Sequence, residues 1–157
     1  LVLGGCADRF QTYTGPDVTQ IVVKKADRRM YLLHDDTVLR AYDIGLGFAP
    51  TGHKQVEGDG KTPEGNYRID RRNPNSAFHL SLGIDYPRPA DVARARALGQ
   101  SPGGDIFIHG RPNLREARRQ ARRAGRDWTA GCITVTDREM REIYAMVAVG
   151  TPIQVQP

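Results

Sequence analysis

The 157-residue sequence predicts one mainly β domain with added helices. Its first half alternates apolar with polar positions and is rich in β-branched and aromatic residues, as half-buried strands are. Its second half contains three segments with helical spacing or helix-capping patterns. The hydrophobic fraction of 39% and charged fraction of 26% suit a globular chain. No apolar run approaches the roughly 18 residues of a membrane span.

The opening strands are expected to form a β-meander over residues 20–44. Alternation predicts strands at residues 20–25, 28–34 and 37–44, with a turn at Asp35 and Asp36. A loop rich in Gly, Pro and Thr then occupies residues 45–65, and a loop this long in a compact domain is usually functional. Further strands are predicted at residues 66–70, 77–84, 105–109 and 153–156.

Three helices are expected between and after these strands. Residues 89–98 are rich in Ala and Arg, with Pro89 placed for a helix start and Gly99 for its stop. Residues 112–124 carry small apolar residues at helical spacing, and Gly125 could close that helix. Thr136 to Glu139 is a capping box. It opens a third helix with one apolar stripe, formed by Met140, Ile143, Tyr144 and Val147.

The positive charge is confined to one segment. Residues 111–127 contain seven arginines and two acidic residues, so this segment alone accounts for the net charge of +5. Such a cluster suggests nucleic acid, but no recognised nucleic-acid motif accompanies it and no aromatic residues interleave with the arginines. A solvated helix face, or a surface that meets anionic polymer or lipid, fits better.

The two cysteines suggest different roles. Leu3-Gly4-Gly5-Cys6 resembles a bacterial lipobox, which predicts lipidation of Cys6 and a chain that begins within a longer precursor. There are two alternatives to lipidation: Cys6 is incidental, or it forms a disulfide with Cys132. Cys132 lies in the middle of the domain sequence, after Thr129-Ala130-Gly131, and is the candidate nucleophile.

A thiol needs a base to become a nucleophile, and His109 is the best candidate because it ends a strand before Gly110. The Gly110 carbonyl is the expected acceptor that orients the imidazole ring. Backbone N–H groups around Ala130–Cys132 could stabilise an oxyanion. Taken alone, a buried structural cysteine explains Cys132 equally well. The other histidines read as structural, and none shows metal-ligand spacing. Trp128 could line a substrate groove or pack in the core.

Four ordered motifs decide between these readings: Gly58-Asp59-Gly60-Lys61-Thr62-Pro63-Glu64-Gly65-Asn66-Tyr67, Ile106-Phe107-Ile108-His109-Gly110, Thr129-Ala130-Gly131-Cys132-Ile133 and Val149-Gly150-Thr151-Pro152-Ile153. With them, residues 20–155 resemble the YkuD-type L,D-transpeptidase catalytic domain. The resemblance implies a curved β-sandwich with added helices. It divides the chain into a lipobox remnant and tether, residues 1–18, and a catalytic domain, residues 19–157.

The resemblance implies that Cys132 attacks the stem peptide of peptidoglycan, releases D-Ala and retains a thioester. His109 would be the base, Gly110 its orienting partner, and Thr129, Ala130 and Gly131 the oxyanion and substrate-binding turn. An amine from another stem, a lipoprotein or a D-amino acid would then resolve the thioester. No metal, cofactor or nucleic acid is implied. The alternatives are a hydrolase of the same fold and a non-catalytic wall-binding lipoprotein.

Three departures from the family pattern accompany the resemblance. Ala130 stands where the family usually has a histidine, and Thr134 stands where it often has Arg or Asn. The gap between His109 and Cys132 is longer than usual, and the arginine-rich segment fills it as a helical insertion expected to flank the cleft. The expected location is the periplasm or cell envelope. Cys6 would be the lipid anchor, and Ala7 weakly favours the outer membrane.

Overall fold

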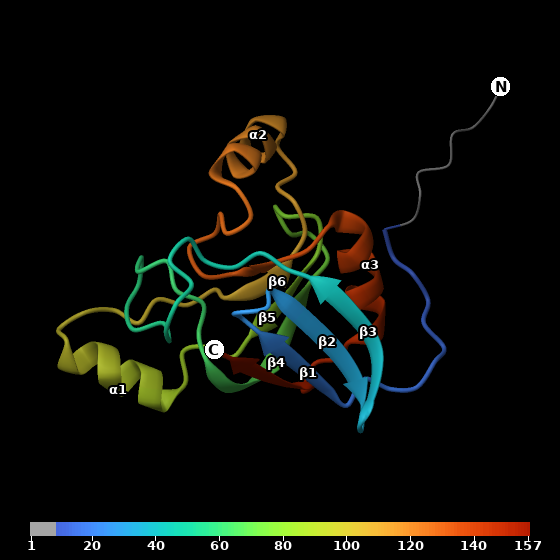
Figure 1. Ribbon diagram of the computed structural model, residues 1–157, viewed down its shortest axis with the longest axis horizontal. Coiled ribbons are helices and arrows are strands. Elements are labelled where there is room, and N and C mark those ends of the chain that lie inside the picture. Colours follow the sequence, from blue (N-terminus) through green and yellow to red (C-terminus); the bar gives the residue numbers. More distant parts are fainter. Residues whose placement is uncertain (1–8) are drawn as a thin grey trace.

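The computed structural model describes residues 9–157, which form eight strands and three helices (Figure 1). The expected lipidation at Cys6 lies outside the described residues. Segment 9–18 has no helix or strand and runs beside α3 (Asp137–Met146) in Figure 1. Its contacts include Arg9 Nη1 to Pro74 O at 3.0 Å. No helix within 9–157 is long and apolar enough to cross a membrane.

The strands form one curled sheet in the order β3-β2-β1-β8-β4-β5-β6-β7. Their bounds are β1 Gln20–Lys24, β2 Arg29–His34, β3 Thr37–Asp43, β4 Gly65–Asn73, β5 Ser81–Ile84, β6 Phe107–His109, β7 Ile133–Thr134 and β8 Pro152–Gln156. The pairs β1–β8 and β6–β7 are parallel, and the other neighbours are antiparallel. The predicted meander, and the mainly β fold with added helices, are confirmed.

The sheet curls until its two ends meet. Strand β4 pairs with β8 and β5, and its register with β5 shifts between Ile69 and Arg71. The chain leaving β3 then forms isolated bridges from Gly45 to Thr134 and from Gly47 to Thr129. These bridges join the start of the glycine-rich loop to the segment that contains Cys132, so the loop and the nucleophile are held together.

Burial of alternate side chains explains the core. Ile21 and Val23 of β1 and Met30 and Leu32 of β2 are fully buried, as the period-two pattern requires. Helix α3 buries its apolar stripe, as predicted, and packs against β5 and β6. Its capping box is present too, with Thr136 Oγ1 accepting from the Glu139 N–H and the Glu139 carboxylate accepting from the Thr136 N–H.

Two helices lie outside this core (Figure 1). Helix α1 (Pro89–Ala97) begins at Pro89, as predicted, and buries only Asp91 and Ala95. Helix α2 (Arg115–Ala124) projects from the body of the molecule and has no buried residue. The small alanines of α2 offer too little apolar area to hold it against the sheet, so most of its surface faces solvent.

Two strand predictions need correction. Residues 77–84 were expected to be one strand, but only Ser81–Ile84 pairs. His79 has a φ of +73°, and Ser76 O and the His79 N–H bond to the side chain of Asn113 instead of to a strand. The sequence analysis also missed β7, because a two-residue strand gives too short an alternation to detect.

A buried lysine fastens the glycine-rich loop to the end of β1. Lys25 is 3% exposed, and its ammonium donates to Gly52 O and Thr62 O, both at 2.8 Å, and to Glu64 Oε1 at 3.0 Å. Burial lowers the Lys25 pKa, although the Glu64 carboxylate opposes this effect. Gly52 lies in the first half of the loop, and Thr62 and Glu64 lie near its end, so one cation joins two separate parts of the loop.

We expect Lys25→Ala to lower the free energy of unfolding by about 3 kcal/mol, because it leaves Glu64, the buried Thr62 carbonyl and the Gly52 carbonyl without their donor. Lys24→Ala is the matched control, since Lys24 is the exposed neighbour on the same strand. Urea denaturation measures both. Equal losses for the two variants would contradict the role of Lys25.

Candidate active site

Cys132 and His109 line the same cavity of about 440 Å³. It lies where β5 and β6 meet the turn before β7. The lining residues are Asn73, Ser76, Ala77, Phe78, Ser81, Asp105, Phe107, His109, Trp128, Thr129, Ala130 and Cys132. The structure therefore brings together the predicted nucleophile and base, which are 23 positions apart in sequence.

The imidazole of His109 is fixed by one hydrogen bond and two aromatic rings. Its Nδ1 lies 2.7 Å from Gly110 O. A carbonyl oxygen only accepts, so Nδ1 carries the proton and Nε2 of the neutral ring keeps its lone pair. Phe78 and Trp128 both pack on the ring, with centroids 4.4 and 5.6 Å from that of His109, and they also pack on each other, with centroids 6.0 Å apart. The expected His109–Gly110 contact is present and leaves the Nε2 lone pair free to accept a proton.

Only glycine fits at position 110, because the surroundings leave no room for a side chain. A Cβ there would lie 2.6 Å from Asp137 Oδ1 and 3.1 Å from Phe78 O. The Gly110 N–H donates to the same Phe78 O at 3.0 Å. Gly110 is thus held between α3 and the segment before β5, and the direction of its carbonyl is set by tertiary packing.

Both members of the Cys–His pair are electrically neutral in the free site. Burial lowers the His109 pKa to about 4, against the opposing effect of the Gly110 hydrogen bond. Burial also raises the Cys132 pKa, although the Phe107 N–H, 3.4 Å from Sγ, favours the thiolate. A thiolate–imidazolium ion pair, the other possible state, would place two charges in this buried site. The structure instead favours a thiol beside a neutral imidazole, because both charged forms would be poorly solvated.

The turn before Cys132 is ordered by the hydroxyl of Thr129. Thr129 Oγ1 accepts from the Gly131 N–H at 3.1 Å and lies 2.8 Å from Cys132 O and 3.1 Å from Leu46 O. The Gly131 N–H is therefore engaged inside the turn. Within the described part of the chain, no hydrogen bond occupies the N–H groups of Ala130 or Cys132. These two groups remain available to an oxyanion.

The glycine-rich loop packs closely against this turn. Gly131 has a φ of +149°, and a Cβ there would lie 2.8 Å from Lys61 O. A Cβ on Gly47 would lie 2.1 Å from Gly60 O and 3.1 Å from the Gly131 Cα. Three stretches of backbone thus meet at contact distance, which only residues without side chains allow.

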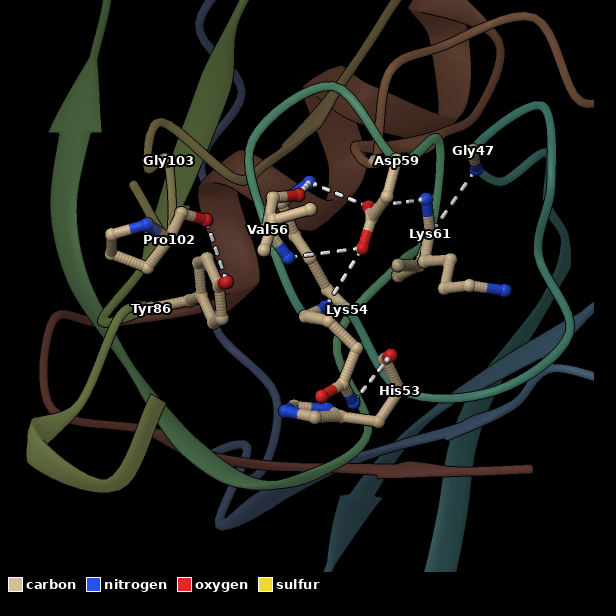
Figure 2. A network of polar contacts seen from close by, with 12 residues as sticks. Gly47, His53, Lys54, Val56, Asp59, Lys61, Tyr86, Pro102 and Gly103 are labelled. Carbon is tan, nitrogen blue, oxygen red and sulfur yellow. Dashed lines mark hydrogen bonds and ion pairs between the residues drawn. The ribbon is translucent and has the colours of Figure 1, made fainter. Parts of the chain in front are cut away.

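Asp59 shapes the part of the loop that Gly131 contacts (Figure 2). Its carboxylate accepts from the N–H groups of Gln55, Val56 and Lys61 and from the buried ammonium of Lys54, at 2.8 to 3.1 Å. Burial alone would raise the Asp59 pKa, but these hydrogen bonds outweigh it and lower the pKa. The motif Gly58-Asp59-Gly60-Lys61 therefore builds a rigid support for the nucleophile turn.

Thr134 and the remaining histidines lie away from the Cys132 cavity. A Cβ on Gly45 would lie 2.4 Å from Thr134 Oγ1, which places the hydroxyl at the bridge between the two ends of the sheet. His53 donates from Nε2 to Asp91 at 2.9 Å and accepts the Glu64 N–H on Nδ1, so it links the loop to α1. No group of three potential metal ligands occurs among residues 9–157.

Sequence reasoning missed the aromatic residues around the pair. Phe78 and Phe107 line the cavity, and nothing in their local sequence marks them as more than strand residues. Trp128 both lines the cavity and packs on His109, which combines the two alternatives considered for it. Its position in Asp127-Trp128-Thr129, next to the nucleophile turn, was the available signal.

Fold and site together define a mainly β domain with a thiol and an imidazole that line one cavity. The model of the YkuD family, the L,D-transpeptidase catalytic domain, matches residues 18–155, and the chain belongs to this family. No curated protein matches the chain in sequence.

Solved structures of similar fold agree with this assignment. The helical cell shape determining protein Pgp2 from Campylobacter jejuni is 25% identical, with a TM-score of 0.59 over 96% of this chain and 51% of that chain. Bdellovibrio bacteriovorus Bd1075 is 21% identical, with a TM-score of 0.57 over 88% and 47%. Mycobacterium tuberculosis L,D-transpeptidase 1 is 15% identical, with a TM-score of 0.55 over 90% and 62%. The last two show the fold alone, and this chain spans about half the length of Pgp2.

The neutral pair predicts how Cys132 reacts with iodoacetamide. We expect its alkylation at pH 7 to be slower than that of a free cysteine, since only the thiolate reacts. The rate of alkylation should keep rising with pH to values above the ordinary thiol pKa of about 8.5. His109→Gln should leave this profile unchanged, because a neutral imidazole does not hold a thiolate. Mass spectrometry of the alkylated peptide gives the rate. A fast, pH-independent rate between about pH 5 and 8 would contradict the prediction and indicate an ion pair.

Proposed function

We propose that this protein is a peptidoglycan L,D-transpeptidase that forms a thioester at Cys132. One observation carries the proposal: Cys132 and His109 share a cavity, and the Gly110 carbonyl occupies Nδ1 so that Nε2 is free to accept a proton. Membership of the YkuD family supplies the substrate class, the stem peptides of peptidoglycan.

In the first half of the reaction, Cys132 Sγ attacks the carbonyl of the third stem residue while His109 Nε2 takes the thiol proton. The negative charge on the carbonyl oxygen meets the free N–H groups of Ala130 and Cys132. The intermediate then collapses, the bond to D-Ala breaks, and the imidazolium returns its proton to the leaving amine. The products are a thioester on Cys132 and free D-Ala.

In the second half, an amine attacks the thioester and His109 again relays the proton. The amine comes from another stem peptide, a lipoprotein or a D-amino acid, and attack by water would make the same site a carboxypeptidase. Both outcomes use the same nucleophile and base. The choice between transfer and hydrolysis therefore depends on whether an amine or water enters the cavity beside Trp128. The similarity to Pgp2, a helical cell shape determining protein, supports including a role in cell shape in the proposal.

The location of the reaction forms a further part of the proposal. Peptidoglycan lies outside the cytoplasmic membrane, so the catalytic domain must work in the cell envelope. Leu3-Gly4-Gly5-Cys6 resembles a lipobox, and a lipid on Cys6 would tether the domain near its polymer substrate.

Incubation with purified disaccharide-tetrapeptide should give a protein adduct that has the mass of the stem without D-Ala. We expect Cys132→Ala to remove the adduct, and His109→Gln to slow its formation at least about 100-fold, because glutamine cannot accept the proton. Intact-mass spectrometry of the full chain, with Cys6→Ser in every variant, measures the adduct.

His34→Gln is the matched control for His109→Gln. His34 lies at the exposed end of β2 and contacts Asp17 O, far from the chemistry in the fold. An adduct that survives Cys132→Ala would refute the assignment of the nucleophile. Cross-linked dimer would identify a transpeptidase, whereas tripeptide alone with every amine acceptor offered would identify a carboxypeptidase.

A further inference from the structure

A second cavity, of about 430 Å³, lies between α2 and the chain segments that flank it. It is lined by Arg111, Pro112, Arg118, Ala121, Arg122, Gly125, Arg126 and Trp128. We call it the arginine groove. Four of its eight lining residues are arginines, and no acidic residue lines it within the described chain. Its floor is formed by small or flat apolar side chains. It therefore suits an anion with some apolar surface.

The arginines of this groove are not all engaged by the protein itself. Arg118 bonds to Pro112 O and lies 3.7 Å from Asp137, and Arg126 donates to Ile44 O at 2.8 Å. These two are held in place by the domain. The side chains of Arg111 and Arg122 have no hydrogen bond or ion pair to any residue of the described part. Two guanidinium groups are thus left free beside two that are fixed.

Folding does not explain these arginines. Helix α2 has no buried residue and projects from the sheet (Figure 1), so its side chains contribute little to the core. Like charges at one site repel each other and destabilise the protein when no anion is present. Asp137 and Asp43 lie 3.7 Å from Arg118 and Arg126, respectively, but neither lines the groove, and Arg111 and Arg122 have no such acidic partner in the described residues. Two unpaired cations in one groove are more simply explained by a ligand than by stability.

The groove also adjoins the catalytic cavity, because Trp128 lines both. Arg111 follows Gly110, whose carbonyl orients the catalytic imidazole. An extended peptide advances about 3.3 Å per residue, so two or three residues suffice to cross one indole ring. A substrate whose reacting carbonyl lies at Cys132 can therefore extend past Trp128 to Arg111 and Arg122.

We propose that the arginine groove binds free carboxylates of the stem peptide that reacts at Cys132. This inference rests on the proposed function, which supplies the substrate. Guanidinium groups match carboxylates with two parallel hydrogen bonds, and such bonds fix orientation as well as adding affinity. The side chains of Arg111 and Arg122 would make these bonds, and Arg118 and Arg126 would add positive potential. The long insertion between His109 and Cys132 would thus extend the substrate site.

The test compares two double variants of equal charge. Arg111→Gln with Arg122→Gln removes the free arginines of the groove. Arg115→Gln with Arg123→Gln removes two arginines of the same segment that also lack partners in the described residues but do not line the groove. Trp128, the only tryptophan of the chain, reports binding by its fluorescence. The probes are disaccharide-tetrapeptide and the same compound with its carboxyl groups amidated, titrated against full-length protein with Cys132→Ala to prevent turnover.

We expect Arg111→Gln/Arg122→Gln to weaken binding of the free-acid peptide about tenfold, the effect of losing charge-assisted hydrogen bonds at a partly exposed site. Arg115→Gln/Arg123→Gln should change it less than about twofold, since screened charges act weakly at a distance. The amidated peptide should bind weakly and equally to all proteins. Equal losses in both double variants, or no loss in either, would overturn the inference.

Two further outcomes separate the inference from the proposed function. If the KM for adduct formation is unchanged in Arg111→Gln/Arg122→Gln with Cys132 intact, the groove does not bind the stem peptide, and the proposed transpeptidase activity is unaffected. If binding requires Arg111 and Arg122 but no adduct forms on intact Cys132, the binding role of the groove is supported and the proposed thioester reaction is refuted. If polyphosphate perturbs Trp128 through these arginines while the stem peptide does not, the occupant is a phosphate polymer and the inference fails.

Discussion

The parallel pairing of β6 with β7 is the constraint on which the site depends. It aligns Ile108 with Ile133 and His109 with Thr134, and so places Cys132 beside Phe107, the first residue of β6. The Phe107 N–H then lies 3.4 Å from Cys132 Sγ. Parallel neighbours need a long connection, and here that connection contains α2. The same pairing therefore creates the catalytic pair and leaves room for the arginine-rich insertion.

Burial of His109 and Cys132 sets the charge state of the pair. A buried imidazole with its pKa lowered to about 4 and a buried thiol with its pKa raised are both neutral around pH 7. The proton must then move when the substrate arrives, because only the developing oxyanion and the leaving amine make charge separation favourable. Such a thiol is protected from stray alkylation and oxidation, because only the thiolate reacts readily.

Rigid supports surround this neutral pair on every side that the structure describes. Gly110 is enclosed by Asp137 and Phe78, and Gly131 rests on the loop that Asp59 and Lys54 organise. The support continues to Lys25, which ties two parts of the loop to the end of β1. Helix α2, by contrast, buries nothing and carries most of the excess positive charge of the chain. The domain thus joins a fixed catalytic centre to an exposed basic surface, and the two meet at Trp128.

The sequence alone determined the strand meander, the start of α1 at Pro89, the capping box at Thr136 and the family, because these depend on local periodicity or on short motifs. It also indicated Cys132, His109 and the Gly110 carbonyl. The structure shows the contact of His109 with that carbonyl and a cavity shared by His109 and Cys132, while the catalytic roles stay predictions. Only the tertiary structure decided the rest. The neutral state of the pair follows from burial, which a sequence does not display, and Phe78 became an active-site residue only because the backbone turns at His79. The grouping of Arg111 and Arg122 beside Trp128 arises from the path of the chain around α2, since long-range packing sets which side chains share a cavity.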